Sequence, residues 1–235
     1  MLDPSLSLKS AIQTMLQRMT QLLNYATAVA PCVKQNPELM TELSESVVLL
    51  MAARLDAFLA TLVSLGAQCR ERTVRKQLWK DGNEVALSCE TPDLVKLVRD
   101  RVSYKKGGKR LNNLFHLILG CSVWPSDKVR DDALDLVLLR NMIVHGDGRD
   151  WSQDGVRPAE YASQFRRHAN LLRVSRYGDL VTYCVDPGEV LPFIKDAALN
   201  IIDEIRYLDQ RLVLDTSWTK SDGLPPANDS VADRS

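Results

Sequence analysis

The sequence predicts a mostly α-helical bundle with a small β-hairpin before its last helix. Through most of the chain, apolar residues recur at intervals of three and four, which is the period of an amphipathic helix. β-branched and aromatic residues instead flank one short turn, Tyr177-Gly178-Asp179. At 235 residues with 45% hydrophobic content, the chain can bury a large core. We therefore expect one domain over residues 1–215, followed by a disordered polar tail over residues 216–235.

Two long helices are expected first. The segment from Ser5 to about Val29 has a clear helical period, and Pro31 and Pro37 predict a break after it. A second helix is expected from Leu39 to Gly66, with the glycine as its C-terminal stop. Because this helix is apolar on nearly all sides, we expect it to occupy a central position.

The middle of the chain is more charged and has weaker periodicity. Helical segments are expected near residues 71–80 and 92–102. A basic loop with two glycines, Lys105 to Arg110, then leads into an apolar helix over residues 111–119, which Gly120 should end.

The remaining elements follow from local signals. Ser126 is a candidate N-cap for a helix that runs to His145, and its acidic first turns suit the positive end of a helix dipole. Gly146 to Gly148 should break this helix, and Pro158 should begin a shorter one that ends at Ala169. The hairpin is expected within residues 172–185, before a final helix over residues 189–214.

Composition excludes several classes of function. Lys and Arg together number 30, as do Asp and Glu, so no overall charge draws the protein to nucleic acid or to a membrane. The most apolar run, Val47 to Ala53, is too short to span a membrane, and Asp3 and Lys9 do not fit a secretory signal. We therefore expect a cytoplasmic protein.

The cysteines indicate neither a metal site nor a disulfide framework. They are odd in number, they are scattered, and none lies at zinc-ligand spacing from another cysteine or a histidine. We expect no metal and no cofactor. We expect all five cysteines to be buried thiols in a reducing compartment. They are Cys32, Cys69, Cys89, Cys121 and Cys184.

The candidate catalytic residues lie near the end of the helix that runs to His145. Asn141 and His145 are four positions apart, on a helical face that is otherwise apolar and lies away from Asp132 and Asp135. Burying two polar side chains there without partners would cost about 1 to 3 kcal/mol each, so we expect them to face a partner or a ligand. The long side chain of Arg140 can reach the same cleft.

These residue types suit metal-independent cleavage of RNA. A histidine in the last turn of a helix is favoured in its protonated form by the negative end of the dipole, so His145 could exchange protons near neutral pH. RNA carries a 2′-hydroxyl next to each phosphate. A proton shuttle and a cation that binds the phosphate oxygens are therefore sufficient for cleavage.

The segment Leu139-Arg140-Asn141-Met142-Ile143-Val144-His145-Gly146 resembles the Arg-polar-x-x-x-His signature of HEPN ribonucleases. The order of elements is similar to that of the RiboL-PSP-type branch over roughly residues 45–212. The resemblance implies a homodimer with a composite site, in which Arg140 binds the scissile phosphate, Asn141 orients the site and His145 acts as acid or base. In that branch an acidic residue often lies on the second helix, and Asp56 occupies the similar position. Residues 68–104 match no known pattern.

The asparagine makes the motif informative. Chance alone would give roughly 0.24 matches to Arg-x4-His in this composition, but only about 0.01 when Asn must follow the Arg. The alternative interpretation of His145 is a C-cap that interacts with the last helical carbonyls. His116, between Phe115 and Leu117, is expected to be a core or semi-buried histidine, and His168 is expected on a solvated face.

The basic loop allows two interpretations. Tyr104, Lys105, Lys106, Lys109 and Arg110 could follow an RNA backbone and stack on a base, or they could form an ordinary solvated loop. Its Gly-Gly-Lys lacks the full spacing and the preceding strand of a nucleotide-binding loop, so a nucleoside triphosphatase is excluded.

The resemblance implies an endoribonuclease that leaves 2′,3′-cyclic phosphate and 5′-hydroxyl ends. The usual setting of the family is a toxin–antitoxin system or antiviral defence, which implies growth arrest and an antitoxin or regulatory protein as a partner. The alternative is a non-catalytic HEPN-like dimeric scaffold that binds RNA, a nucleotide or a partner protein. The RNA target is left open.

Overall fold

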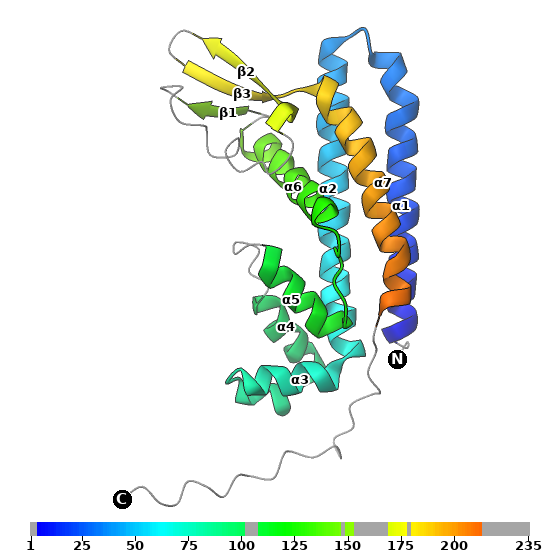
Figure 1. Cartoon of the computed structure of the whole chain (residues 1–235), viewed down its shortest axis with the longest axis vertical. Coiled ribbons are helices and arrows are strands. Elements are labelled where there is room, and N and C mark those ends of the chain that lie inside the picture. The colour runs from blue at the N-terminus through cyan, green and yellow to red at the C-terminus, as the bar shows by residue number, and fades with distance from the viewer. Residues whose placement is uncertain (1–3, 102–107, 147–148, 153–168, 178–179, 213–235) are drawn as a thin grey trace, which may run out of the picture. The chain divides into compact units, whose positions relative to one another are not determined.

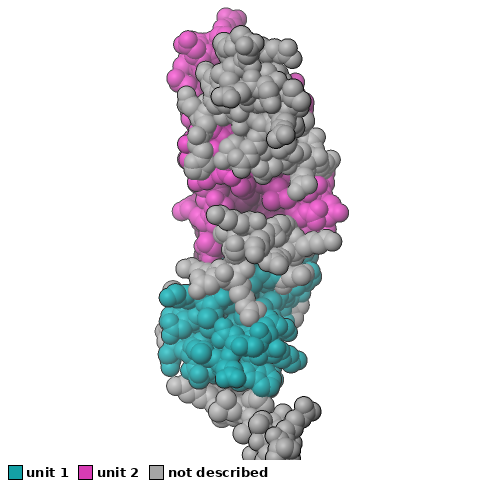
Figure 2. All heavy atoms as spheres, turned by 90° about the vertical axis from the view of Figure 1, so that its left-hand side faces the viewer, with its two compact units in different colours: residues 1–8, 62–122, 211–235 teal, residues 9–61, 123–210 magenta. Residues whose placement is uncertain are grey.

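The described part of the protein is mostly helical and includes a small antiparallel sheet (Figure 1). The computed structural model describes residues 4–101, 108–146, 149–152, 169–177 and 180–212. These residues form two compact units, which Figure 2 shows in two colours. Unit 1 comprises residues 1–8, 62–122 and 211–235, and unit 2 comprises residues 9–61 and 123–210. The expected single domain over residues 1–215 stays a prediction, and the expected disordered tail over residues 216–235 lies outside the described residues.

The first two helices are longer than their sequence signals suggested. Helix α1 spans Pro4–Val33 and α2 spans Pro37–Cys69. Pro31 was expected to break the chain, but it lies inside the last turn of α1, and the helix ends only two residues after it. The break is instead at Asn36, whose side-chain oxygen accepts hydrogen bonds from the backbone N–H groups of Glu38 and Leu39.

Gly66 does not end α2, contrary to its predicted role as a stop. It is buried within the helix, and a Cβ atom there would lie 2.7 Å from Leu119 Cδ2 and 2.9 Å from the Ile118 carbonyl oxygen. The glycine therefore allows α5 (Gly108–Leu119) to pack directly against the backbone of α2.

Helix α2 is apolar enough that its length and composition alone would allow it to span a membrane. The mean hydropathy of its most apolar 18-residue window is 1.9, and half of that window is buried inside the protein. The buried side chains include Val47, Met51 and Leu55, which are at most 1% exposed. A core helix of a folded bundle has the same composition.

Unit 1 contains the end of α2 and a set of shorter helices. They are α3 (Glu71–Lys80), the 3-10 turn η1 (Glu84–Leu87), α4 (Thr91–Arg101) and α5. The expected helices near residues 71–80 and 92–102 are thus confirmed. Helix α5 begins at Gly108 rather than at residue 111, and it ends as expected at Gly120, whose φ of 75° is the left-handed conformation of a helix C-cap.

Unit 2 combines most of the two long helices with α6 (Asp127–Gly146), the sheet and nearly all of α7 (Pro187–Arg211). Arg54 of α2 donates a hydrogen bond to the carbonyl oxygen of Arg18 on α1. Asn200 of α7 donates one to Asp132 of α6, at 3.3 Å. Asp186 directly precedes α7, and its carboxylate caps the helix by accepting a hydrogen bond from the N–H of Gly188.

The sheet has three strands in the order β1-β3-β2. The expected hairpin is confirmed as β2 (Leu172–Tyr177) and β3 (Leu180–Val185), in a register that places Tyr177 opposite Leu180. The edge strand β1 (Arg149–Ser152) was not predicted, because four residues are too few to reveal an alternating pattern. Ala169–Leu171 forms a 3-10 turn, and the rest of the helix expected from Pro158 lies outside the described residues.

Candidate active site

Helix α6 carries the motif residues in its last two turns. The helix begins directly after Ser126 and ends at Gly146, so its observed bounds agree with the predicted ones within a residue. Arg140 and Asn141 lie one turn before His145 along the helix. The side chain of His145 lies outside the part of the chain that the structure describes.

The two faces of α6 differ in burial. Its interior face carries Leu136, Leu139 and Met142, all 0% exposed. The opposite face is a half-exposed stripe, which we call the motif stripe. Its members are Leu134, Val137, Leu138, Asn141 and Val144. Val144 is 49% exposed, so apolar side chains on this stripe remain available for contact with another surface.

Arg140 and Asn141 contact each other directly. The guanidinium Nη1 of Arg140 donates a hydrogen bond to the side-chain oxygen of Asn141, at 2.9 Å. Both side chains are partly buried. The long side chain of Arg140 therefore reaches toward Asn141 across the helix surface, and its cationic head is held there by a neutral acceptor.

Asp56 on α2 lies within electrostatic range of this pair. Burial raises the pKa of the Asp56 carboxyl above its ordinary value, and the positive charge of Arg140 partly lowers it again. The fold of unit 2 thus brings Asp56 and Arg140 together from positions far apart in the sequence. Within the described part of the chain they form no direct ion pair, so the guanidinium keeps donor groups available for an anion.

The buried face of α6 holds two carboxylates that sequence reasoning did not place in the interior. Asp132 is 2% exposed and Asp135 is 0% exposed. The amide of Asn200 binds Asp132, and both acids have further polar partners. Charged residues are rarely buried, because the burial of a charge is costly unless polar partners surround it. Tertiary structure supplies such partners, so a local sequence pattern does not predict the burial.

The described part of the structure does not test the five predicted RNA-binding residues. Tyr104, Lys105 and Lys106 lie outside the described residues. Lys109 and Arg110 are in the first turn of α5 in unit 1, and their side chains also lie outside the described part of the structure. The RNA-binding role of these five residues stays a prediction.

His116 was expected in or near the core, and the structure shows that this is wrong. Its side chain is exposed, and its neighbour Phe115 is the buried residue, at 1% exposure. Burial in an amphipathic helix follows the helical face, so a residue between two apolar neighbours can point outward. The carbonyl of His116 accepts a hydrogen bond from Arg70. His168 lies outside the described residues.

The cysteines differ from the expectation of five buried thiols. All five are free, but only Cys69 is buried, Cys32 is exposed and the others are intermediate. Among the residues that the structure describes, no three His, Cys, Asp or Glu side chains group closely enough to hold a metal ion.

No protein-family model matches this chain, and the comparisons found no similar curated protein or solved structure. The family resemblance therefore depends on the motif and on the order of elements.

Proposed function

We propose that this protein is a metal-independent endoribonuclease of the HEPN type, located in the cytoplasm. The observation that carries the proposal is the hydrogen bond from Arg140 to Asn141, which is a member of the half-exposed motif stripe. It supports a role in which Arg140 offers its charge to a phosphate and Asn141 fixes the direction of the guanidinium.

The proposed reaction needs one proton acceptor and one proton donor. The 2′-oxygen attacks the adjacent phosphorus, the bond from phosphorus to the 5′-oxygen breaks, and a 2′,3′-cyclic phosphate and a 5′-hydroxyl result. One His145 takes the proton of the 2′-hydroxyl, and a second His145 protonates the leaving oxygen. Arg140 stabilises the negative charge that develops on the phosphate oxygens.

The need for two histidines is met by a homodimer. A two-fold axis beside α6 would bring two copies of the motif to one site. The motif stripe supports this arrangement, because its half-exposed leucine and valine side chains would be covered by the same stripe of the second copy. Asp56 would limit the free charge of Arg140 and help to orient it.

The biological role that fits this activity is a toxin or an antiviral-defence effector. Uncontrolled cleavage of cellular RNA arrests growth, so a neutralising antitoxin or regulatory protein is the expected partner. The proposed chemistry requires no cofactor.

The test is cleavage of total cellular RNA by the purified protein in EDTA, with analysis of the fragment ends. His145→Ala should abolish cleavage. His116→Ala, which changes an exposed histidine elsewhere, should leave it intact. Loss of cleavage in EDTA would contradict the metal-independent mechanism, and fragments with 3′-hydroxyl ends would exclude attack by the 2′-hydroxyl.

The alternative is a HEPN-like dimeric scaffold that binds RNA, a nucleotide or a partner protein without cleaving. The half-exposed apolar stripe favours dimerisation in either case. The two functions differ in one outcome: the scaffold predicts that the wild type and His145→Ala are equally inactive and equally dimeric.

A further inference from the structure

Helix α3 presents a row of cations and one tryptophan to solvent. Arg72, Lys76, Trp79 and Lys80 fall within an arc of about 100° when drawn at 100° per residue. We call these four residues the α3 stripe. Lys76 and Lys80 are exposed, Arg72 is half-exposed, and Trp79 is 41% exposed. A tryptophan is usually well buried, so one that lies open among three cations needs an explanation.

The charge of the α3 stripe is not neutralised nearby. Within the described part of the chain, Arg72, Lys76 and Lys80 form no ion pair. The one acidic residue of α3, Glu71, is turned to Arg75, whose side chain is only 4% exposed. Asp81, at the end of the helix, accepts a hydrogen bond from Gln77, which is not a member of the stripe. The stripe therefore carries a local positive charge, although the whole chain has a formal net charge of zero.

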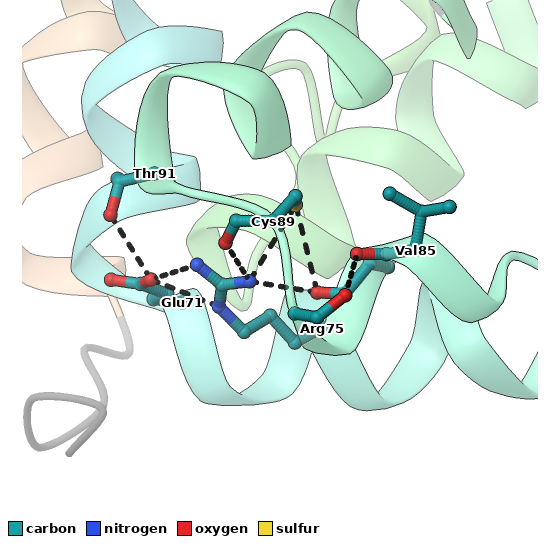
Figure 3. A network of polar contacts seen from close by, with 7 residues as sticks. Glu71, Arg75, Val85, Cys89 and Thr91 are labelled. Atoms are coloured by element: carbon teal, nitrogen blue, oxygen red, sulfur yellow. Dashed lines mark hydrogen bonds and ion pairs between the residues drawn. The ribbon is translucent and has the colours of Figure 1, made fainter. Parts of the chain in front are cut away.

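A buried network holds α3 rigidly in unit 1 (Figure 3). The Arg75 guanidinium donates to Glu71 and, through Nη1, to the carbonyl oxygens of Ala86 and Cys89, both at 2.8 Å. Thr91, at the start of α4, donates to the same Glu71 oxygen. These bonds join α3 to η1 and α4. Because the buried bonds fix the helix, binding a ligand at its outer face costs little ordering.

We propose that the α3 stripe binds single-stranded RNA. Cations attract the phosphates, and the open face of an indole stacks on an unpaired base, which is the combination that single-strand binding surfaces use. The choice of RNA over DNA rests on the proposed function. The proposal gives a role to a stretch of sequence that resembles no known pattern.

The helix does not suit insertion into a lipid surface. The apolar side chains of α3, Val74 and Leu78, are both 0% exposed and face the interior of unit 1. An interfacial helix instead buries a broad apolar face in the lipid, and Trp79 alone does not provide one. Double-stranded nucleic acid keeps its bases stacked, so it would use the cations but not the indole.

The test is binding of a fluorescein-labelled oligouridylate of about 12 nucleotides, followed by anisotropy. All variants are made in the His145→Ala background, so that the probe stays intact and the result does not depend on whether the protein cleaves RNA. Lys76→Glu with Lys80→Glu should weaken binding by about 10-fold or more at 0.1 M salt. The slope of log affinity against log salt concentration should become shallower by about 1.4, because two phosphate contacts are lost. Trp79→Ala should weaken binding by about 5- to 100-fold.

The matched control reverses the charge of two lysines that lie outside unit 1. Lys34→Glu with Lys195→Glu makes the same change in net charge, and both residues are exposed. If the control weakens binding of the oligouridylate equally, overall charge explains the effect and the proposal is overturned. Unchanged binding by Trp79→Ala, or equal affinity for a double-stranded RNA of the same length, would also overturn it.

Circular dichroism should show that the stripe variants stay folded, since the changed side chains lie at the surface. Binding and cleavage, measured separately, distinguish this proposal from the proposed ribonuclease. A wild type that binds the probe through the stripe but cleaves no RNA would refute the ribonuclease and leave the binding surface standing. If the wild type cleaves RNA but the stripe variants bind the probe as tightly as their parent does, the binding surface is refuted and the ribonuclease stands.

Discussion

The guanidinium of Arg140 donates a hydrogen bond to the side-chain oxygen of its neighbour Asn141, at 2.9 Å. The acceptor is neutral, so it orients the arginine without cancelling its charge. If Arg140 binds a phosphate, a carboxylate at position 141 would compete with that phosphate for the same donors.

Asn141→Asp should therefore lower the rate of RNA cleavage more than Asn141→Ser does. We expect a loss of about 100-fold for the aspartate, because removal of one donor that stabilises a developing oxyanion costs a similar factor. The serine keeps a neutral acceptor and should lose about 10-fold or less. Single-turnover cleavage of a short RNA measures both. Equal losses would show that the charge at position 141 is irrelevant.

Asp56 gives a prediction for the dependence of stability on pH. Its folded pKa is raised above the ordinary value of 3.8, mainly by burial. The folded state therefore binds the proton more tightly than the unfolded state does. The associated stability is present below pH 3.8 and is lost as the pH rises through the folded pKa.

Asp56→Asn mimics the protonated carboxyl, so it should match the wild type near pH 3 and be more stable at pH 7. Because the side chain is only partly buried, we expect a rise in Tm of about 1 to 3 °C. Arg140→Ala should raise the pKa of Asp56 further, since the cation lowers it. Thermal unfolding across this pH range and NMR titration of the carboxyl are the measurements. A stabilising effect that is larger at pH 3 than at pH 7 would contradict the assignment.

Much of this architecture could be predicted from periodicity and local signals. The bounds of α6, its end at Gly146 and the β2–β3 hairpin follow from residues close together in the sequence. The burial of Asp132 and Asp135 could not be predicted, and for Asp132 the reason is visible, because its partner Asn200 on α7 is distant in the sequence. A family resemblance suggested a supporting role for Asp56, but its closeness to Arg140 could not be predicted, since local spacing says nothing of contacts between α2 and α6.

Gly66 shows the same limit, because its role depends on a helix that is distant in the sequence. In an isolated helix, Gly66→Ala would gain about 1 kcal/mol from propensity. Here the new Cβ would lie 2.9 Å from the carbonyl oxygen of Ile118, and a backbone atom cannot move aside as a side chain does. We expect a net loss of about 1 to 3 kcal/mol in urea unfolding.

The control for this substitution is Gly188→Ala in the first turn of α7. There the nearest atom to a new Cβ is the side-chain Oδ1 of Asp186, at 3.2 Å. That side chain can adjust, so the control should change stability by less than about 1 kcal/mol. If the two substitutions have equal effects, the close approach of α5 to Gly66 is not what limits that position.

Arg75 should be essential for the stability of unit 1. Removing its side chain would take this donor from the carbonyls of Ala86 and Cys89, and it would leave the partly buried carboxylate of Glu71 without its paired cation. Arg75→Met should cost about 3 to 5 kcal/mol, and Arg75→Lys should recover only part because an ammonium cannot reach all these acceptors. Hydrogen exchange of the α3 and α4 amides localises the effect. An equal effect of Arg72→Met, on the exposed side of the same helix, would refute it.

The rate at which each cysteine is alkylated should depend on the burial of its thiol. Burial raises the pKa of the half-buried Cys121 thiol, and the charges of Arg211 and Arg70 lower it only in part. The exposed Cys32 has no such barrier to solvent. Because the thiolate is the reacting species, iodoacetamide at pH 8 should modify Cys32 at least about 10-fold faster than Cys121. Peptide mass spectrometry over time measures both rates. In urea the two rates should converge, and a difference that survives unfolding would show that the sequence around each thiol, rather than its burial, sets the reactivity.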